Sequence, residues 1–98
     1  MSSQETKNVS SELPAEQIEY CMLTWDYYGP SAEGTARHFH HHLDEWLKRE
    51  GLTDRVRETW VEQSTEMHYF AACVIAFSDG ERVYRALKAH RAVKVAPS

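Results

Sequence analysis

Apolar and polar residues alternate or recur in patterns that predict both strands and helices. Residues 18–28 alternate, with one apolar row and an end at Gly29-Pro30, which predicts a strand. From Ser31 to Gly51 the apolar residues recur at spacings of three and four, which predicts an amphipathic helix that Ser31 caps and Gly51 ends. The apolar stripe of this helix consists of Ala32, Ala36, Phe39, Leu43, Trp46 and Leu47.

The second half of the chain also contains strand-like patterns followed by a helix-like one. Residues 55–64 alternate, and a short turn leads to residues 67–77, which predicts a β-hairpin. Both alternating rows of residues 67–77 are apolar, as expected for a central strand that is covered on both faces. Ser78 and Glu81 have the spacing of a capping box and predict a second helix, with Arg91 toward its C-terminal end. Residues 92–95 predict a short last strand.

The resulting order of strand, helix, strand, strand, helix and strand is typical of the ferredoxin-like fold. We therefore expect an α+β, βαββαβ sandwich in which an antiparallel four-stranded sheet carries two helices on one face. The first and third strands are central in that topology, and they are the two strands that the sequence makes apolar. The other face of the sheet would expose apolar side chains to water, which predicts a homo-oligomer through that face, a homodimer first and a trimer as the alternative.

Length, charge and composition narrow the class of protein. The 98 residues predict one domain over residues 18–98, preceded by a polar, Ser-rich tail over residues 1–17 that we expect to be disordered. A formal charge of −4 argues against nucleic acid as a partner. No apolar run has the length of a membrane span or the form of a secretory signal, so we expect no membrane partner and a cytoplasmic protein. Cys21 and Cys73 lack metal-site spacing and are expected to be buried and reduced, and no cofactor is expected.

A histidine-rich run, "RHFHHH" at residues 37–42, falls within the first predicted helix. On a helix, His38, His41 and Glu45 share the solvent face at spacings that can hold Zn²⁺ or Ni²⁺, with His42 beside them. We expect a solvated face without a physiological metal, so these three residues are candidates for adventitious binding only. His40 lies on the flank of the apolar stripe, toward the sheet edge, and is a candidate ligand-binding residue.

His68 is a second candidate because it lies in an apolar strand, where a polar group needs a partner. If Cys21 lies opposite Cys73 in an antiparallel pair, Asp26 falls beside His68, and the two can act as acid and base. The same register would permit a disulfide between the cysteines, which a reducing compartment disfavours. The alternative is that His68 pairs with a carboxylate for structure alone. The candidates for lining a pocket around the pair are Tyr28, Trp60 and Tyr69.

In its order of elements, the segment 18–95 resembles two groups of ferredoxin-like proteins, the dimeric α+β barrels and the PII-like trimeric sensors. The hairpin between Trp60 and Tyr69 is too short for the long loop of the PII signalling proteins. Two functions follow. The first, which we favour, is a small cytoplasmic, homo-oligomeric binding or regulatory module that associates through its apolar sheet face and takes a small-molecule ligand. The alternative is a dimeric α+β-barrel enzyme, monooxygenase- or isomerase-like, acting on a small aromatic or enolisable molecule with Asp26 and His68 in a pocket between sheet and helices.

Overall fold

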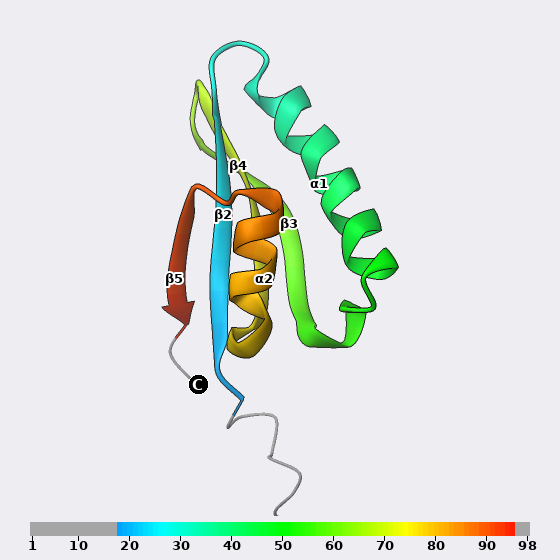
Figure 1. Cartoon of the computed structure of the whole chain (residues 1–98). Coiled ribbons are helices and arrows are strands. Elements are labelled where there is room, and N and C mark those ends of the chain that lie inside the picture. The colour runs from blue at the N-terminus through cyan, green and yellow to red at the C-terminus, as the bar shows by residue number, and fades with distance from the viewer. Residues whose placement is uncertain (1–17, 96–98) are drawn as a thin grey trace, which may run out of the picture.

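The computed structural model of the chain describes residues 18–95 (Figure 1). The predicted tail, residues 1–17, and residues 96–98 lie outside the described residues. The elements in chain order are strand β2 (Tyr20–Tyr28), helix α1 (Ala32–Arg49), the 3-10 turn η2 (Thr53–Arg55), strands β3 (Val56–Thr65) and β4 (His68–Ala76), helix α2 (Phe77–Leu87) and strand β5 (Arg91–Val95).

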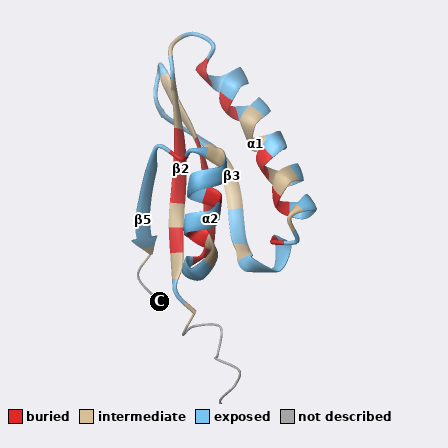
Figure 2. Ribbon diagram, viewed as in Figure 1, coloured by how far each residue is buried: buried red, intermediate tan, exposed pale blue. Residues whose placement is uncertain are grey.

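The strands form one four-stranded sheet in the order β3-β4-β2-β5, and every neighbouring pair is antiparallel. An α+β architecture with an antiparallel four-stranded sheet and two helices is thus observed, and the predicted central strands, β2 and β4, lie in the middle. Both helices pack on the same face of this sheet, because the buried residues of α1 and α2 share one cluster with one row from each central strand. Figure 2 shows the buried stripe of α1 and the buried middle of β2, whereas β5 is largely exposed.

The register of the central pair differs from the predicted one by two residues. Cys21 lies opposite Ile75, and Cys73 lies opposite Leu23. Both cysteines are free and buried, so the disulfide that the predicted register permits is not formed. Burial raises the pKa of the Cys73 thiol to about 12, which makes it unreactive at neutral pH. Because side chains alternate with a period of two, a shift of two residues leaves every side chain on its predicted face.

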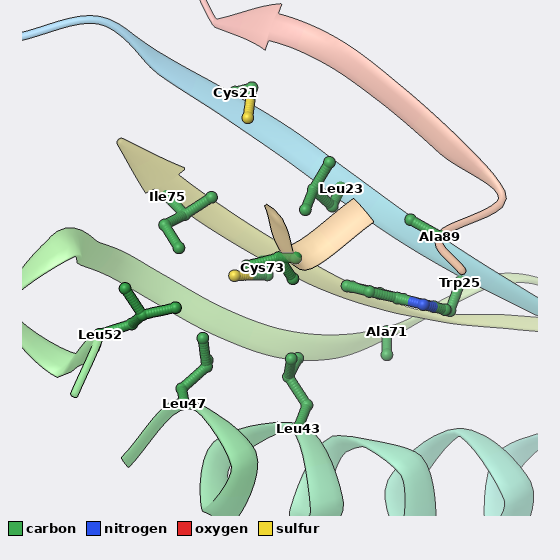
Figure 3. Close-up of a cluster of buried hydrophobic side chains, with 11 residues drawn as sticks. Cys21, Leu23, Trp25, Leu43, Leu47, Leu52, Ala71, Cys73, Ile75 and Ala89 are labelled. Atoms are coloured by element: carbon green, nitrogen blue, oxygen red, sulfur yellow. The ribbon is translucent and has the colours of Figure 1, made fainter. Parts of the chain in front are cut away.

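The core lies between the helices and the sheet (Figure 3). Leu43 and Leu47 of α1 point toward the sheet, where they meet the row of β2 and β4 that contains Leu23 and Ile75. Trp25 is the largest fully buried side chain, with 2% of its surface exposed. Its indole N–H donates to the backbone carbonyl of Leu87 at 2.9 Å and so ties the last turn of α2 to β2.

Both helix starts differ in detail from the predicted caps. Ser31 occupies the N-cap position of α1, but its hydroxyl makes no cap hydrogen bond. The predicted capping box at Ser78 and Glu81 is wrong, because β4 runs directly into α2 and Ala76 is the N-cap. Ser78 therefore lies inside the first turn, where its hydroxyl accepts a 3.3 Å hydrogen bond from Nη2 of Arg55. Arg91, expected near the end of this helix, instead begins β5.

Gly80 packs directly against Cys21, since a Cβ added at this glycine would clash with the cysteine Sγ. We expect Gly80→Ala to lower the free energy of unfolding by about 1 to 3 kcal/mol through overpacking. Cys21→Ala in the same chain removes the sulfur and should restore most of that loss. Urea unfolding of the two single variants and the double variant measures the coupling. Simple additivity of the two losses would contradict this contact.

Candidate functional site

The candidate site lies on the face of the sheet opposite the helices, hereafter the open face. Its residues belong to the row of β2 that contains Asp26 and to the row of β4 that contains His68 and Phe70. In the antiparallel ladder Asp26 lies directly opposite Phe70, and His68 lies opposite Tyr28. Asp26 and His68 are therefore diagonal neighbours on one face, a separation that long side chains can span.

The predicted pair of Asp26 and His68 is brought together. Nε2 of His68 lies 2.7 Å from Oδ1 of Asp26, and the two side chains are 18% and 8% exposed. A carboxylate can only accept, so this hydrogen bond places the proton on Nε2 of His68 and leaves Nδ1 as the basic nitrogen of the neutral ring. The predicted contact forms even though the register differs by two residues from the predicted one, because such a shift leaves both side chains on the same face of the sheet.

Arg91 of β5 completes the cluster from the other side of β2. Its Nε donates to Oδ2 of Asp26 at 2.9 Å, and its Nη2 donates to Oδ1 at 2.9 Å. This is the bidentate fork that guanidinium and carboxylate groups form. The guanidinium carbon also lies 5.8 Å from the centroid of the Phe70 ring. A partner in β5 was not predicted, and the only sequence signal for it is a basic residue at the start of the short last strand.

The charge state of Asp26 follows from these contacts. Burial by itself raises the pKa of the carboxyl, but the hydrogen bonds and charges of Arg91 and His68 outweigh it and hold the pKa below its usual value. Asp26 is therefore an ionised carboxylate at neutral pH and a weak base. Its chemical capacity is to orient His68, while Arg91 neutralises part of the negative charge of the carboxylate.

Two further side chains frame the cluster. The exposed ring of Tyr28 stacks on His68 with centroids 4.4 Å apart and an interplanar angle of 19°. The backbone N–H of Asp26 donates to Nδ1 of His90 at 2.8 Å. His90 directly precedes β5, so this bond also holds the start of β5 against β2. Tyr28 was predicted to line the site, whereas His90 was missed, since it lies in a short connection without a recognisable pattern.

The remaining predicted pocket residues do not gather at the pair. Trp60 lies on the open face but in β3, opposite Ala72, and its indole N–H donates to Glu62. Tyr69 lies on the helix side of the sheet, where its hydroxyl donates to Glu33 of α1 at 3.4 Å. His40 is also on the helix side, with Nε2 at 2.9 Å from the hydroxyl of Thr59.

The predicted pocket between sheet and helices around Asp26 and His68 is therefore wrong. The reason is alternation: residues 68 and 69 are neighbours in one strand and must point to opposite faces. A groove of about 440 Å³ does lie on the helix side between α2 and β5. It is lined by Cys21, Leu23, Phe77, Ser78, Gly80, Glu81, Tyr84, Ala92, Val93 and Lys94, a set that contains neither Asp26 nor His68.

The predicted adventitious metal ligands do not converge either. Nε2 of His41 lies 3.2 Å from the carboxylate of Glu45, whereas the ring of His38 faces His42. Within residues 18–95, no group of three or more His, Cys, Asp or Glu side chains is arranged to hold a metal ion. In the same part of the chain, neither helix is long and apolar enough to cross a membrane.

Comparisons of the chain with models of known protein families, with curated proteins and with solved structures found no match.

Proposed function

We propose that this chain is a homodimeric binding or regulatory module with a ferredoxin-like fold, which associates through its open face in the reducing cytoplasm. The observation that carries the proposal is the apolar character of this face. Both described helices pack on the opposite face, so within residues 18–95 no element covers the open one. Its apolar residues, contributed by all the strands, are Tyr20, Met22, Trp60, Phe70, Val74 and Val93.

Five of these residues keep part of their surface in water, which supports an interface, whereas Val74 is buried by its neighbours. Val93 of β5 is 52% exposed, and Trp60 and Phe70 are only partly buried. The strand spacing and the nine residues of β2 give a face of roughly 30 by 20 Å. A standard interface buries about 800 Å² of accessible surface on each partner. Protruding side chains make the accessible area of a sheet face larger than its flat outline, so a face of this size can supply that area. Apolar side chains that gather on an uncovered sheet face are typical of a protein–protein contact.

The charges on the open face favour a second copy of the same chain. Arg57 lies over the Tyr20 ring at 5.6 Å and Arg91 lies beside Phe70, so the face carries two guanidinium groups. Asp26, which pairs with Arg91, and Glu58 and Glu62 of β3 lie on the same face, so the face carries charges of both signs. A two-fold axis makes a surface pair with itself, and a face with charges of both signs allows opposite charges to meet in that arrangement. A polyphosphate partner would instead need an excess of positive charge.

The enzyme remains a second candidate because of one specific observation. His68 and Asp26 form a short hydrogen bond between largely buried side chains, the arrangement of a base and its orienting group. Substrate would have to reach Nδ1 of His68 from the open face, beside the exposed Tyr28 ring. In a dimer formed through this face, the reacting molecule would lie between the two sheets. A small aromatic or enolisable molecule fits the stacking surface that Tyr28 provides.

A native mass spectrum of the untagged protein, as purified from cells, tests both candidates. We expect twice the chain mass, and a retained organic mass would favour the enzyme or a ligand-binding role. Val93→Glu and Trp60→Lys place charges on the open face and should shift the protein to monomer with unchanged far-UV circular dichroism. Tyr84→Glu is the matched control, because Tyr84 is 41% exposed on α2 and should leave the dimer intact. A wild-type monomer at micromolar concentration would overturn the proposal.

A further inference from the structure

Two histidines of the run at residues 38–42 bring their ring nitrogens together on the outer face of α1. Nε2 of His38 and Nε2 of His42 lie 3.1 Å apart, and the ring centroids are 4.5 Å apart at an interplanar angle of 79°. Residues four apart on a helix lie one above the other, so this pairing follows from the sequence spacing. Both residues are exposed, and the pair is therefore open to ions from solution.

The separation of the two nitrogens is suited to a shared metal ion. At a metal–nitrogen distance of about 2.05 Å, nitrogens 3.1 Å apart subtend roughly 100° at the ion. This angle lies between that of square-planar or octahedral coordination and that of a tetrahedron. Imidazole nitrogens suit Cu²⁺, Ni²⁺ and Zn²⁺, whereas Mg²⁺ and Ca²⁺ select oxygen ligands.

Glu45 supports the coordinating form of His42. A carboxylate oxygen of Glu45 lies 3.8 Å from Nδ1 of His42, on the other side of the ring from His38. A carboxylate at this position favours the proton on Nδ1, which leaves the lone pair on Nε2 for a metal ion. At 3.8 Å this contact is electrostatic and not a hydrogen bond, so Glu45 assists the site through its negative charge.

We propose that His38 and His42 form a two-nitrogen chelating site for a divalent transition-metal ion, with Cu²⁺ bound most tightly and water completing the coordination. The site differs from the set predicted from the sequence, which joined His38 to His41 and Glu45. His41 is excluded because its Nε2 is directed at Glu45, and His40 because it bonds to Thr59 at the sheet. The site does not depend on the proposed dimer, since α1 lies on the other side of the sheet from the open face.

The test is metal titration of the untagged full chain at pH 7.5, with CuCl2 and NiCl2 followed by calorimetry and by thermal unfolding. We expect one ion per chain at this site. At a metal concentration about tenfold above Kd, binding to the folded state should raise Tm by roughly 5 to 10 °C. MgCl2 should have no effect.

His38→Gln and His42→Gln should each weaken binding at least about tenfold, and His41→Gln is the matched control that should retain it. All three positions are exposed, so the variants should keep the far-UV circular dichroism of the wild type. Full-strength binding in the double variant His38→Gln/His42→Gln would place the ion elsewhere and overturn the proposal. A loss in His41→Gln with retention in His38→Gln would also overturn it, as would absence of binding in the wild type.

Discussion

Asp26→Ala is expected to lower the free energy of unfolding by about 2 to 3 kcal/mol. The substitution removes the shared acceptor of His68 and Arg91, and the N–H of the largely buried His68 ring then has no carboxylate to accept its hydrogen bond. Breaking a fully buried charge pair costs about 3 to 5 kcal/mol. The loss here should be smaller because Arg91 is 56% exposed and can return to water. Urea unfolding at one fixed protein concentration measures the difference.

The same variant tests the pH dependence of stability. The folded-state pKa of Asp26 lies below its usual value, so the carboxylate stabilises the fold fully above the unfolded pKa of about 3.9. This stabilisation is lost as pH falls from about 4 through the folded pKa. The gap between wild type and Asp26→Ala should therefore be constant near neutrality and close in acid. Asp54→Ala, at an exposed carboxylate in η2, should stay within about 0.5 kcal/mol of the wild type. Parallel profiles for wild type and Asp26→Ala would contradict the role assigned to the cluster.

Trp25→Ala is expected to lower the free energy of unfolding by about 3 to 5 kcal/mol, the largest loss from any single substitution considered. The indole is 2% exposed and packs on Phe39 with centroids 4.8 Å apart, so its removal leaves a large cavity. A domain of this size has a total stability of roughly 4 to 12 kcal/mol. The loss is thus a large fraction of the total, and it should appear as a much lower midpoint in urea titration followed by far-UV circular dichroism.

Trp25→Phe separates packing from hydrogen bonding at this position. Phenylalanine fills much of the space but cannot donate to the Leu87 carbonyl, so we expect a loss of about 1 to 2 kcal/mol. Trp60→Ala, at a partly exposed tryptophan on the other face, should cost less than Trp25→Ala in the monomer. Equal losses for the two alanine variants would show that the core does not depend on Trp25 as described.

The order of elements could be predicted because each run is short and its alternation is regular. The faces were predicted for the same reason, since alternation depends only on whether a residue number is odd or even. The register could not be predicted, because Phe70, Ala72, Val74 and Ala76 offer an apolar partner at every second position. Registers that differ by two residues bury the same kind of surface. The actual register fits a turn in which the backbone N–H of Gly29 donates to the carbonyl of Met67 at 2.8 Å.

The candidate site was predictable only where its parts lie on strands with a clear pattern. Asp26 and His68 are both polar residues in apolar rows, so each indicates that a partner is needed. Arg91 and His90 carry no such signal, because their contacts with Asp26 join positions 65 and 64 residues apart. Tyr69 was assigned to the same pocket as His68 by its proximity in sequence, and the pleat of β4 separates the two.

The fork between Arg91 and Asp26 also bears on how the chain folds as it is synthesised. Asp26 leaves the ribosome 65 residues before Arg91, which corresponds to roughly 3 to 13 s of translation. In the last part of that interval, once β4 has also been synthesised, β2 can pair with β4 but not yet with β5, so one edge of the central strand and the Asp26 carboxylate remain in water. The free edge of β2 can therefore pair with a strand of another molecule until β5 is in place. The late step that covers this edge is the docking of the five residues of β5.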